Sequence, residues 1–100
     1  MGKNPRITNE VLKVLNAISD APDMSGAQIA KATGLSSGTL YPILLRLESA
    51  GWLESEWEDA SPQSLGRPRR RYYQMTGVGR LHAASAAREM QQSIGRLAWS

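Results

Sequence analysis

The sequence predicts a mainly α-helical protein with one small β-hairpin, an α+β fold class supported by three features of the chain. Apolar residues recur at helical spacing in four stretches. One stretch, residues 52–57, instead reads as a strand with alternating side chains. The segment that follows it, residues 60–68, contains two prolines and a glycine, which is typical of the loop of a hairpin.

The composition excludes several classes of protein. One hundred residues suit a single domain with a modest core, which often depends on a partner subunit. Without cysteine there are no disulfides and no thiolate metal sites, and the single histidine leaves little for a metal site or a catalytic relay. We therefore expect no enzyme, no cofactor and no metal. No leader-like or membrane-length apolar run is present, so we expect a soluble, cytoplasmic protein.

Charge is distributed unevenly along the chain. Residues 1–50 carry a net charge of +1, residues 51–65 carry −4, and residues 66–100 carry +6. The basic segment begins with four arginines within five positions, residues 67–71. A basic segment behind an acidic strand indicates one face that is built to meet a polyanion.

The first two helices have clear boundaries. Apolar spacing predicts a helix over Thr8–Asp20, and Ala21–Asp23 ends it because proline interrupts the helix. Ser25 and Gln28 match a capping box that opens a second, short helix. Gly34 is suited to the left-handed position just beyond its end.

A third helix is predicted to reach about Ala50, with Ser36, Ser37 or Thr39 as its cap. Pro42 is tolerated best in the first turn, which favours Thr39, or local distortion if the helix starts earlier. Its buried stripe consists of Leu40, Ile43, Leu44 and Leu47. The outward face carries Gly38, Tyr41, Pro42, Leu45, Arg46 and Ser49. Two helices joined by a tight turn, with a polar outer face on the second, predict a helix-turn-helix.

Gly51 ends that helix, and a returning strand is predicted at Arg70–Met75. A hairpin directly after a helix-turn-helix is a wing. Thr76 caps a last helix that reaches about Trp99. We therefore expect a winged helix-turn-helix DNA-binding domain over residues 1–75 and a C-terminal dimerisation helix over residues 76–100.

The last helix carries an apolar seam at spacings of four and three residues, which is typical of helix pairing. Its members are Ala83, Ala87, Met90, Ile94 and Leu97. The alternative is that this stripe packs back on its own domain. A helix of this length spans about 36 Å at 1.5 Å per residue, too long for one small domain to cover. The seam therefore predicts a homodimer.

Two motifs resemble those of the PadR-like transcriptional regulators. Ser37-Gly38-Thr39-Leu40-Tyr41-Pro42, with Leu44, Leu47, Glu48 and Gly51 after it, is similar to the third helix of that family. Gly66-Arg67-Pro68-Arg69, followed by Tyr72-Tyr73 and residues 75–79, is similar to its wing and the start of its last helix. The resemblance implies a winged helix and a homodimeric DNA-binding repressor, sometimes released by a small molecule. With one C-terminal helix the chain is similar to the short branch, so we expect no ligand site of the kind that a longer C-terminal domain builds.

The candidate DNA-binding residues lie on the third helix and the wing. On the helix they are Ser36, Ser37, Gly38, Thr39, Tyr41, Pro42 and Arg46. On the wing they are Arg67, Arg69, Arg70 and Arg71. The start of a recognition helix meets base edges and phosphates, and arginine is attracted to a narrow minor groove. The alternative for the helix is ordinary capping. For the wing the alternatives are a solvated basic turn, or ion pairs of Arg69 and Arg71 across the hairpin with Glu54, Glu56 or Glu58.

The remaining polar and aromatic residues have simpler interpretations. Glu54, Glu56 and Glu58 indicate a solvated strand face rather than paired catalytic carboxylates, since no nucleophile or metal ligand accompanies them. We expect His82 at the surface or at an interface, and Trp52 and Trp57 in the core or between helices. The sequence thus predicts a sequence-specific regulator that acts on a pseudo-palindromic operator. The alternative is a winged helix used for protein interaction or nucleic-acid architecture without a defined operator.

Overall fold

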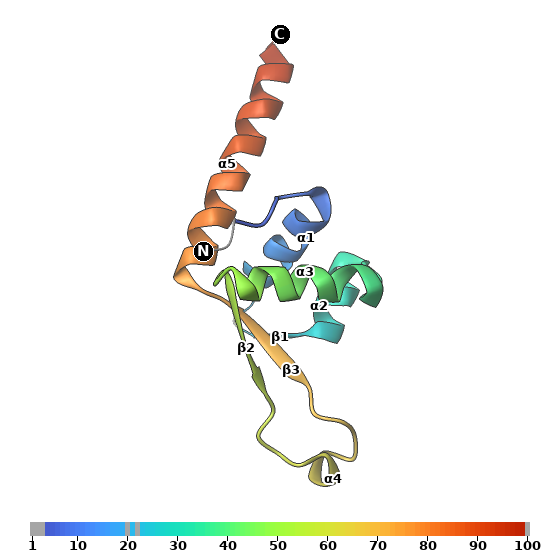
Figure 1. Ribbon diagram of the computed structural model, residues 1–100. Coiled ribbons are helices and arrows are strands. Elements are labelled where there is room, and N and C mark those ends of the chain that lie inside the picture. Colours follow the sequence, from blue (N-terminus) through green and yellow to red (C-terminus); the bar gives the residue numbers. More distant parts are fainter. Residues whose placement is uncertain (1–3, 20, 22, 100) are drawn as a thin grey trace.

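The computed structural model describes residues 4–19, 21 and 23–99. In chain order the helices are α1 (Asn9–Ser19), α2 (Gly26–Thr33), α3 (Ser37–Ser49), α4 (Pro62–Leu65) and α5 (Gly77–Trp99). The strands are β1 (Met24–Ser25), β2 (Leu53–Trp57) and β3 (Arg71–Met75). They form an antiparallel sheet in the order β1-β3-β2. The fold is a winged helix, so the predicted class is confirmed (Figure 1).

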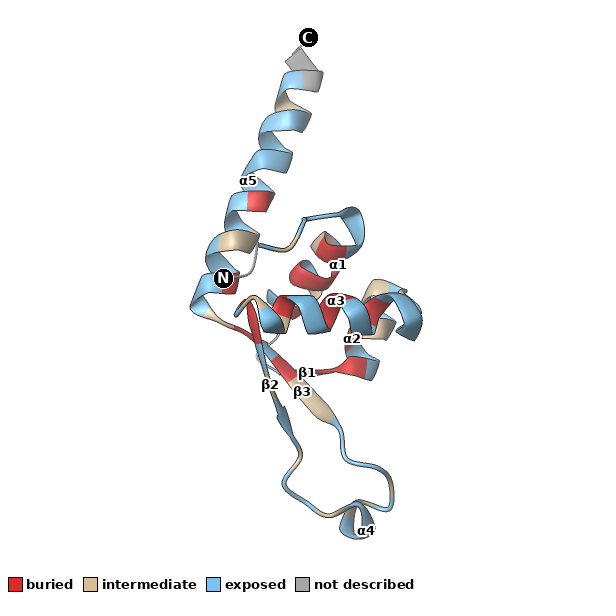
Figure 2. Cartoon of the chain, viewed as in Figure 1, coloured by how far each residue is buried: buried red, intermediate tan, exposed pale blue. Residues whose placement is uncertain are grey.

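Three helices and the base of the hairpin enclose one hydrophobic core. The predicted stripes of α1 and α3 supply most of it, and Trp52 is the largest fully buried side chain. The core consists of Val11, Val14, Leu15, Ile18, Ile29, Leu40, Ile43, Leu44, Leu47, Trp52, Leu53, Tyr73 and Met75. Burial stops where the hairpin leaves the helices (Figure 2). The wing and the far half of α5 therefore extend from opposite ends of the core, along a molecule 60 Å in its longest dimension.

Most helix ends follow the local signals. The capping box of Ser25 and Gln28 is formed, and Gly34 ends α2 with a φ of 73° in the left-handed region. The Thr76 hydroxyl accepts a hydrogen bond from the Gly79 amide at 3.0 Å, as expected of a cap. The start of α3 differs from the favoured cap at Thr39, because Ser36 occupies the cap position and its carbonyl accepts the Leu40 amide.

Pro42 consequently lies in the second turn of α3. The backbone group that loses its partner there is the carbonyl of Gly38, four residues earlier. Gly38 is solvent-exposed, so water can hydrate this carbonyl. The missing hydrogen bond therefore destabilises the helix less at this position than it would in a buried helix.

The first turns of α5 are locked onto the core. A methyl group at Gly79 would come within 2.1 Å of the carbonyl oxygen of Trp52, so only glycine permits this approach. His82 stacks on Trp52 with ring centroids 4.2 Å apart, and Ala86 is buried in the same half of the helix. His82 is thus half-buried against its own core, where we had expected a surface or interface residue. These contacts fix the direction in which the rest of α5 leaves the domain.

Candidate nucleic-acid interface

The wing has two faces of opposite character. On one side, a hollow is lined by five acidic residues and by no basic residue. The acidic residues are Asp23, Glu54, Glu56, Glu58 and Asp59. The other side faces α3, where a hollow of about 420 Å³ has arginines and no carboxylate in its lining. We call this second feature the wing hollow. Its lining residues are Ser25, Gly26, Ala27, Tyr41, Trp57, Arg69, Arg70, Arg71 and Tyr73.

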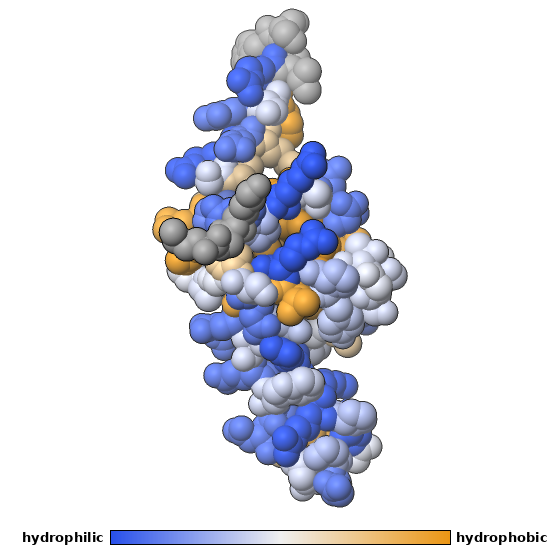
Figure 3. Space-filling view, in the orientation of Figure 1, coloured by the Kyte–Doolittle hydropathy of each residue, from blue (hydrophilic) through white to orange (hydrophobic). Residues whose placement is uncertain are grey.

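The two faces follow from the pleat of β2 and β3. Ser55 pairs with Tyr73 and Trp57 with Arg71, so these four side chains share the side toward α3. Glu54 and Glu56 occupy the alternate positions and are exposed on the other side, as predicted for a solvated strand face. The hydrophilic surface of the wing is visible in Figure 3. A polyanion can therefore approach one face of the wing and is repelled from the other.

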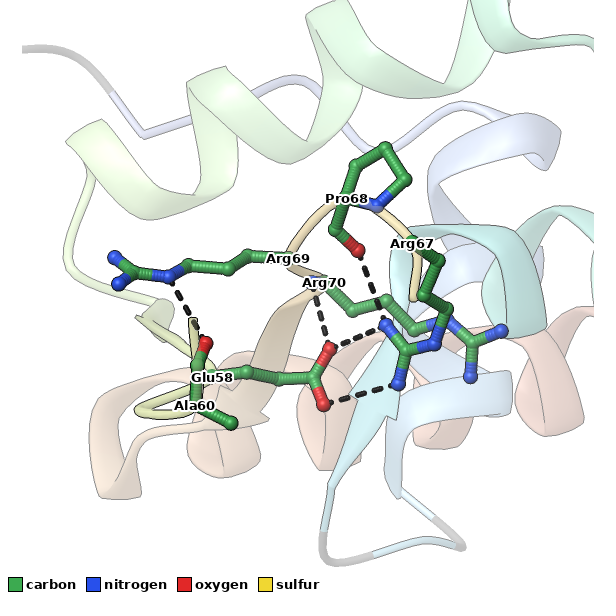
Figure 4. Close-up of polar contacts among 6 residues, drawn as sticks. All are labelled: Glu58, Ala60, Arg67, Pro68, Arg69 and Arg70. Atoms are coloured by element: carbon green, nitrogen blue, oxygen red, sulfur yellow. Dashed lines mark hydrogen bonds and ion pairs between the residues drawn. The ribbon is translucent and has the colours of Figure 1, made fainter. Parts of the chain in front are cut away.

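Two of the four wing arginines are engaged by carboxylates. Arg67 makes a two-pronged ion pair with Glu58, at 2.6 Å from Nη1 to Oε1 and 3.1 Å from Nη2 to Oε2 (Figure 4). The Arg70 backbone amide also donates to Glu58 at 2.8 Å. The Arg67 guanidinium, and after it this amide, holds the pKa of Glu58 below its ordinary value. The Glu58 carboxylate thus connects the two sides of the wing loop. These contacts are lost as the pH falls through the lowered pKa of Glu58 and the carboxylate becomes protonated.

Arg71 is held by α3. Its Nη2 atom contacts both carboxylate oxygens of Glu48, at 2.9 and 3.1 Å, and its Nε donates to the Ser55 hydroxyl at 2.7 Å. Ser55 in turn donates to Glu48. The guanidinium also lies over the rings of Trp57 and Tyr73, at 5.6 and 5.8 Å from their centroids. Arg71 thus ties the wing to the recognition helix, a role that its place in the basic run did not reveal.

Arg69 and Arg70 are the arginines that remain available. Both are solvent-exposed. Arg69 donates through Nε to the carbonyl of Ala60 at 3.1 Å, and its terminal nitrogens have no hydrogen-bond partner among the described residues (Figure 4). Within the described part of the chain, no hydrogen bond or ion pair engages the Arg70 guanidinium. The alternative interpretation, in which Arg69 and Arg71 pair with Glu54, Glu56 or Glu58, does not hold, since the ion pairs among the described residues are Arg67–Glu58 and Arg71–Glu48.

The helix residues named from the sequence divide into two groups. Tyr41 is 49% exposed and joins the arginines in the wing hollow, where its hydroxyl lies over Gly26 so closely that a methyl group there would come within 2.7 Å. A separate groove between α1 and α3 is lined by Gly38, Thr39, Pro42 and Arg46, together with Thr8 and Glu10.

At the start of α3 the backbone is open to a ligand. Ser36 and Ser37 are exposed, and the Ser36 hydroxyl donates to that of Thr39 at 3.3 Å rather than capping an amide. The first helical amides, those of Ser37 and Gly38, point out of the helix end without an intrahelical partner. Such amides and the positive end of the helix attract phosphate.

The tryptophans contradict one expectation. Trp52 is 1% exposed and lies in the core as predicted, whereas Trp57 is 57% exposed and was wrongly assigned to the core or to helix packing. The hairpin simply extends past the helices before Trp57 is reached. The alternation of residues 52–57 predicted the strand, but no local signal shows where the core ends.

Comparison with known proteins identifies the family. The model of the transcriptional regulator PadR-like family matches residues 14–85, which include α2, α3 and the entire wing. The chain belongs to this family. It is therefore a DNA-binding transcriptional regulator, and the resemblance noted in the sequence is confirmed.

Solved structures agree with this assignment. A PadR family transcription regulator from Clostridium difficile R20291 is 24% identical, with a TM-score of 0.73 over 90% of this chain and 98% of that one. A PadR family regulator from Eggerthella lenta DSM 2243 is 26% identical, with a TM-score of 0.66 over 84% of this chain and 79% of that one.

BpsR from Bordetella bronchiseptica, whose DNA binding is regulated by 6-hydroxynicotinic acid, is 22% identical with a TM-score of 0.70. The match covers 87% of this chain and 64% of BpsR. No curated protein sequence matches this PadR-like chain. Among the described helices, none combines the length and the apolar character needed to cross a membrane.

The contacts of Arg71 in this PadR-like protein allow a stability test. We expect Glu48→Gln and Arg71→Gln each to destabilise the fold by about 1 kcal/mol, because the pair is partly exposed but charge-assisted, with one arginine nitrogen in contact with both carboxylate oxygens. In a double-mutant cycle the two substitutions should be coupled, whereas Glu54→Gln, which changes an exposed carboxylate on the same hairpin, should have no effect. Chemical denaturation measures the free energies. Additive effects of the two substitutions would contradict the link between the wing and α3.

Proposed function

We propose that this PadR-like protein is a repressor that binds a pseudo-palindromic operator as a homodimer and blocks transcription by occupying the promoter. The main observation in support of DNA binding is the wing hollow. It places Tyr41 of α3 beside Arg69 and Arg70 of the wing, in a hollow with no carboxylate in its lining. In winged helices, such a face meets duplex DNA with the helix start in the major groove and the wing over the adjacent backbone or minor groove.

The homodimer is supported by the exposed half of α5. Met90 and Ile94 are 45% and 59% exposed, and Ala87 is exposed beside them. Ala83, the first residue of the proposed seam, is half-buried against its own core, and the side chain of Leu97 lies outside the described residues. The N-terminal segment and α1 form a further groove beside this helix, lined by Ile7, Leu12 and Met90 among others. A partner helix would cover this apolar surface.

Selection of bound fragments from random duplex DNA tests the operator. We expect enrichment of an inverted repeat whose half-sites are centred about one helical turn apart, or a multiple of it, because a two-fold dimer presents two recognition helices in this way. Binding without enrichment of any sequence would favour the alternative, a nucleic-acid architecture module without a defined operator. Transcription from a promoter that carries the selected site then measures repression.

Thr39 and Tyr41 should make the contacts that distinguish one DNA sequence from another. Replacing either by alanine is expected to weaken binding to the selected operator by about 1–3 kcal/mol while changing affinity for random duplexes less. Titration of both DNAs against each variant measures the difference. Equal losses on the two DNAs would mean contacts to phosphate, and a large fall in melting temperature would mean a structural role. Ser49→Ala, at an exposed position near the end of α3, is the control.

A further inference from the structure

Trp57 is an unusual residue to find on a wing. It is the last residue of β2, and 57% of its surface is exposed. An exposed indole presents a large apolar area to water, which is informative when the residue lies beside a binding face. Neither the motif in α3 nor the basic run of the wing includes it.

Trp57 borders both hollows of the wing, and on the side toward α3 its surroundings match the chemistry of a nucleic-acid backbone. The indole and the Tyr41 ring line the wing hollow from two different elements, β2 and α3. Arg69 and Arg70 line it as well, and no carboxylate does. A hollow with apolar ring walls and uncompensated cations fits a ligand unit that is both apolar and anionic. A deoxyribose with its phosphate is such a unit.

The indole is also held in place before any ligand arrives. Trp57 pairs with Arg71 across the hairpin, and the guanidinium of Arg71 lies 5.6 Å from the centroid of the indole ring. Arg71 is itself fixed by the Glu48 carboxylate on α3. Because the ring is positioned relative to the recognition helix, its contact with a ligand loses little conformational entropy.

We propose that Trp57 is a DNA contact, and that the wing hollow receives one sugar–phosphate unit of the duplex backbone. The indole packs against the carbons of the deoxyribose, while Arg69 and Arg70 pair with the phosphate. This proposal rests on the proposed function and adds a sequence-independent, uncharged contact to it.

Salt dependence separates this contact from those of the arginines. An indole releases no counterion, so Trp57→Leu should weaken binding to all duplexes about five- to tenfold without changing the slope of log affinity against log salt concentration. Tyr72→Leu, an aromatic substitution on the acidic face of the same hairpin, should leave affinity unchanged. Melting temperatures identify any variant that fails to fold, and Trp57→Phe provides a milder replacement.

Fluorescence gives a second readout that a structural role would not produce. Addition of duplex DNA should quench tryptophan emission in the wild type and in Trp99→Phe, and the quenching should disappear in Trp57→Phe. Full affinity of folded Trp57→Leu, a changed salt slope, or unaltered quenching in Trp57→Phe would overturn the proposal while DNA binding by the wild type stands. Failure of the wild type to bind any duplex would instead overturn the proposed function.

Discussion

Replacing both Arg69 and Arg70 by alanine is expected to lower affinity for every duplex roughly 10- to 100-fold, since each lost charge-assisted contact costs on the order of 1 kcal/mol. The slope of log affinity against log salt concentration should also fall by up to about two, one for each lost phosphate contact. The physical reason is that these guanidinium groups are exposed and uncompensated, so their charge is available to release counterions. Titrations of operator and random DNA at several salt concentrations measure both quantities.

The matched control removes the same charge elsewhere. Lys13→Ala combined with Arg88→Ala deletes two exposed cations, on α1 and α5, and should leave the slope unchanged. Arg67→Ala is informative in another way, because Glu58 already neutralises that arginine. It should change the slope less than either Arg69→Ala or Arg70→Ala. An unchanged affinity and slope in the Arg69 and Arg70 double variant would refute the role of the wing.

Placing a charge at Ile94 is expected to convert the proposed dimer to monomers. If α5 pairs through its apolar seam, Ile94→Asp buries an unpaired carboxylate, and the desolvation penalty amounts to several kcal/mol unless the helices separate. The monomer would present one recognition helix, so operator affinity should fall toward the level of non-specific binding. Sedimentation and operator titration measure the two effects.

Gln92→Asp is the control for this experiment. It introduces the same charge two residues earlier, on the other side of the helix, at an exposed position. The variant should remain dimeric with full operator affinity. A stable dimer of Ile94→Asp would contradict the proposed seam, and a monomer that kept full operator specificity would contradict the coupling between dimerisation and operator reading.

The elements that the sequence predicted correctly are those whose signals are local. The capping box at Ser25, the glycine at position 34 and the apolar stripe of α3 act within a few residues, so spacing alone reveals them. Two elements were missed. The strand β1 has only two residues and exists because it pairs with β3, nearly fifty residues later. The single turn of α4 lies within the segment predicted to be loop.

The functional residues also divide into those revealed by local signals and those that depend on contacts between distant parts of the chain. By itself, the sequence determined the winged helix, the family motifs and the concentration of positive charge after residue 66, since periodicity, turn chemistry and net charge are properties of adjacent residues. Only the tertiary structure decided which arginines remain available. The partner of Arg71, in β3, is Glu48, 23 residues away on α3, and the partner of Arg67 lies across the wing loop. Tertiary structure likewise decided that Trp57 lies outside the core, because the point at which a hairpin leaves its supporting helices depends on how the elements pack.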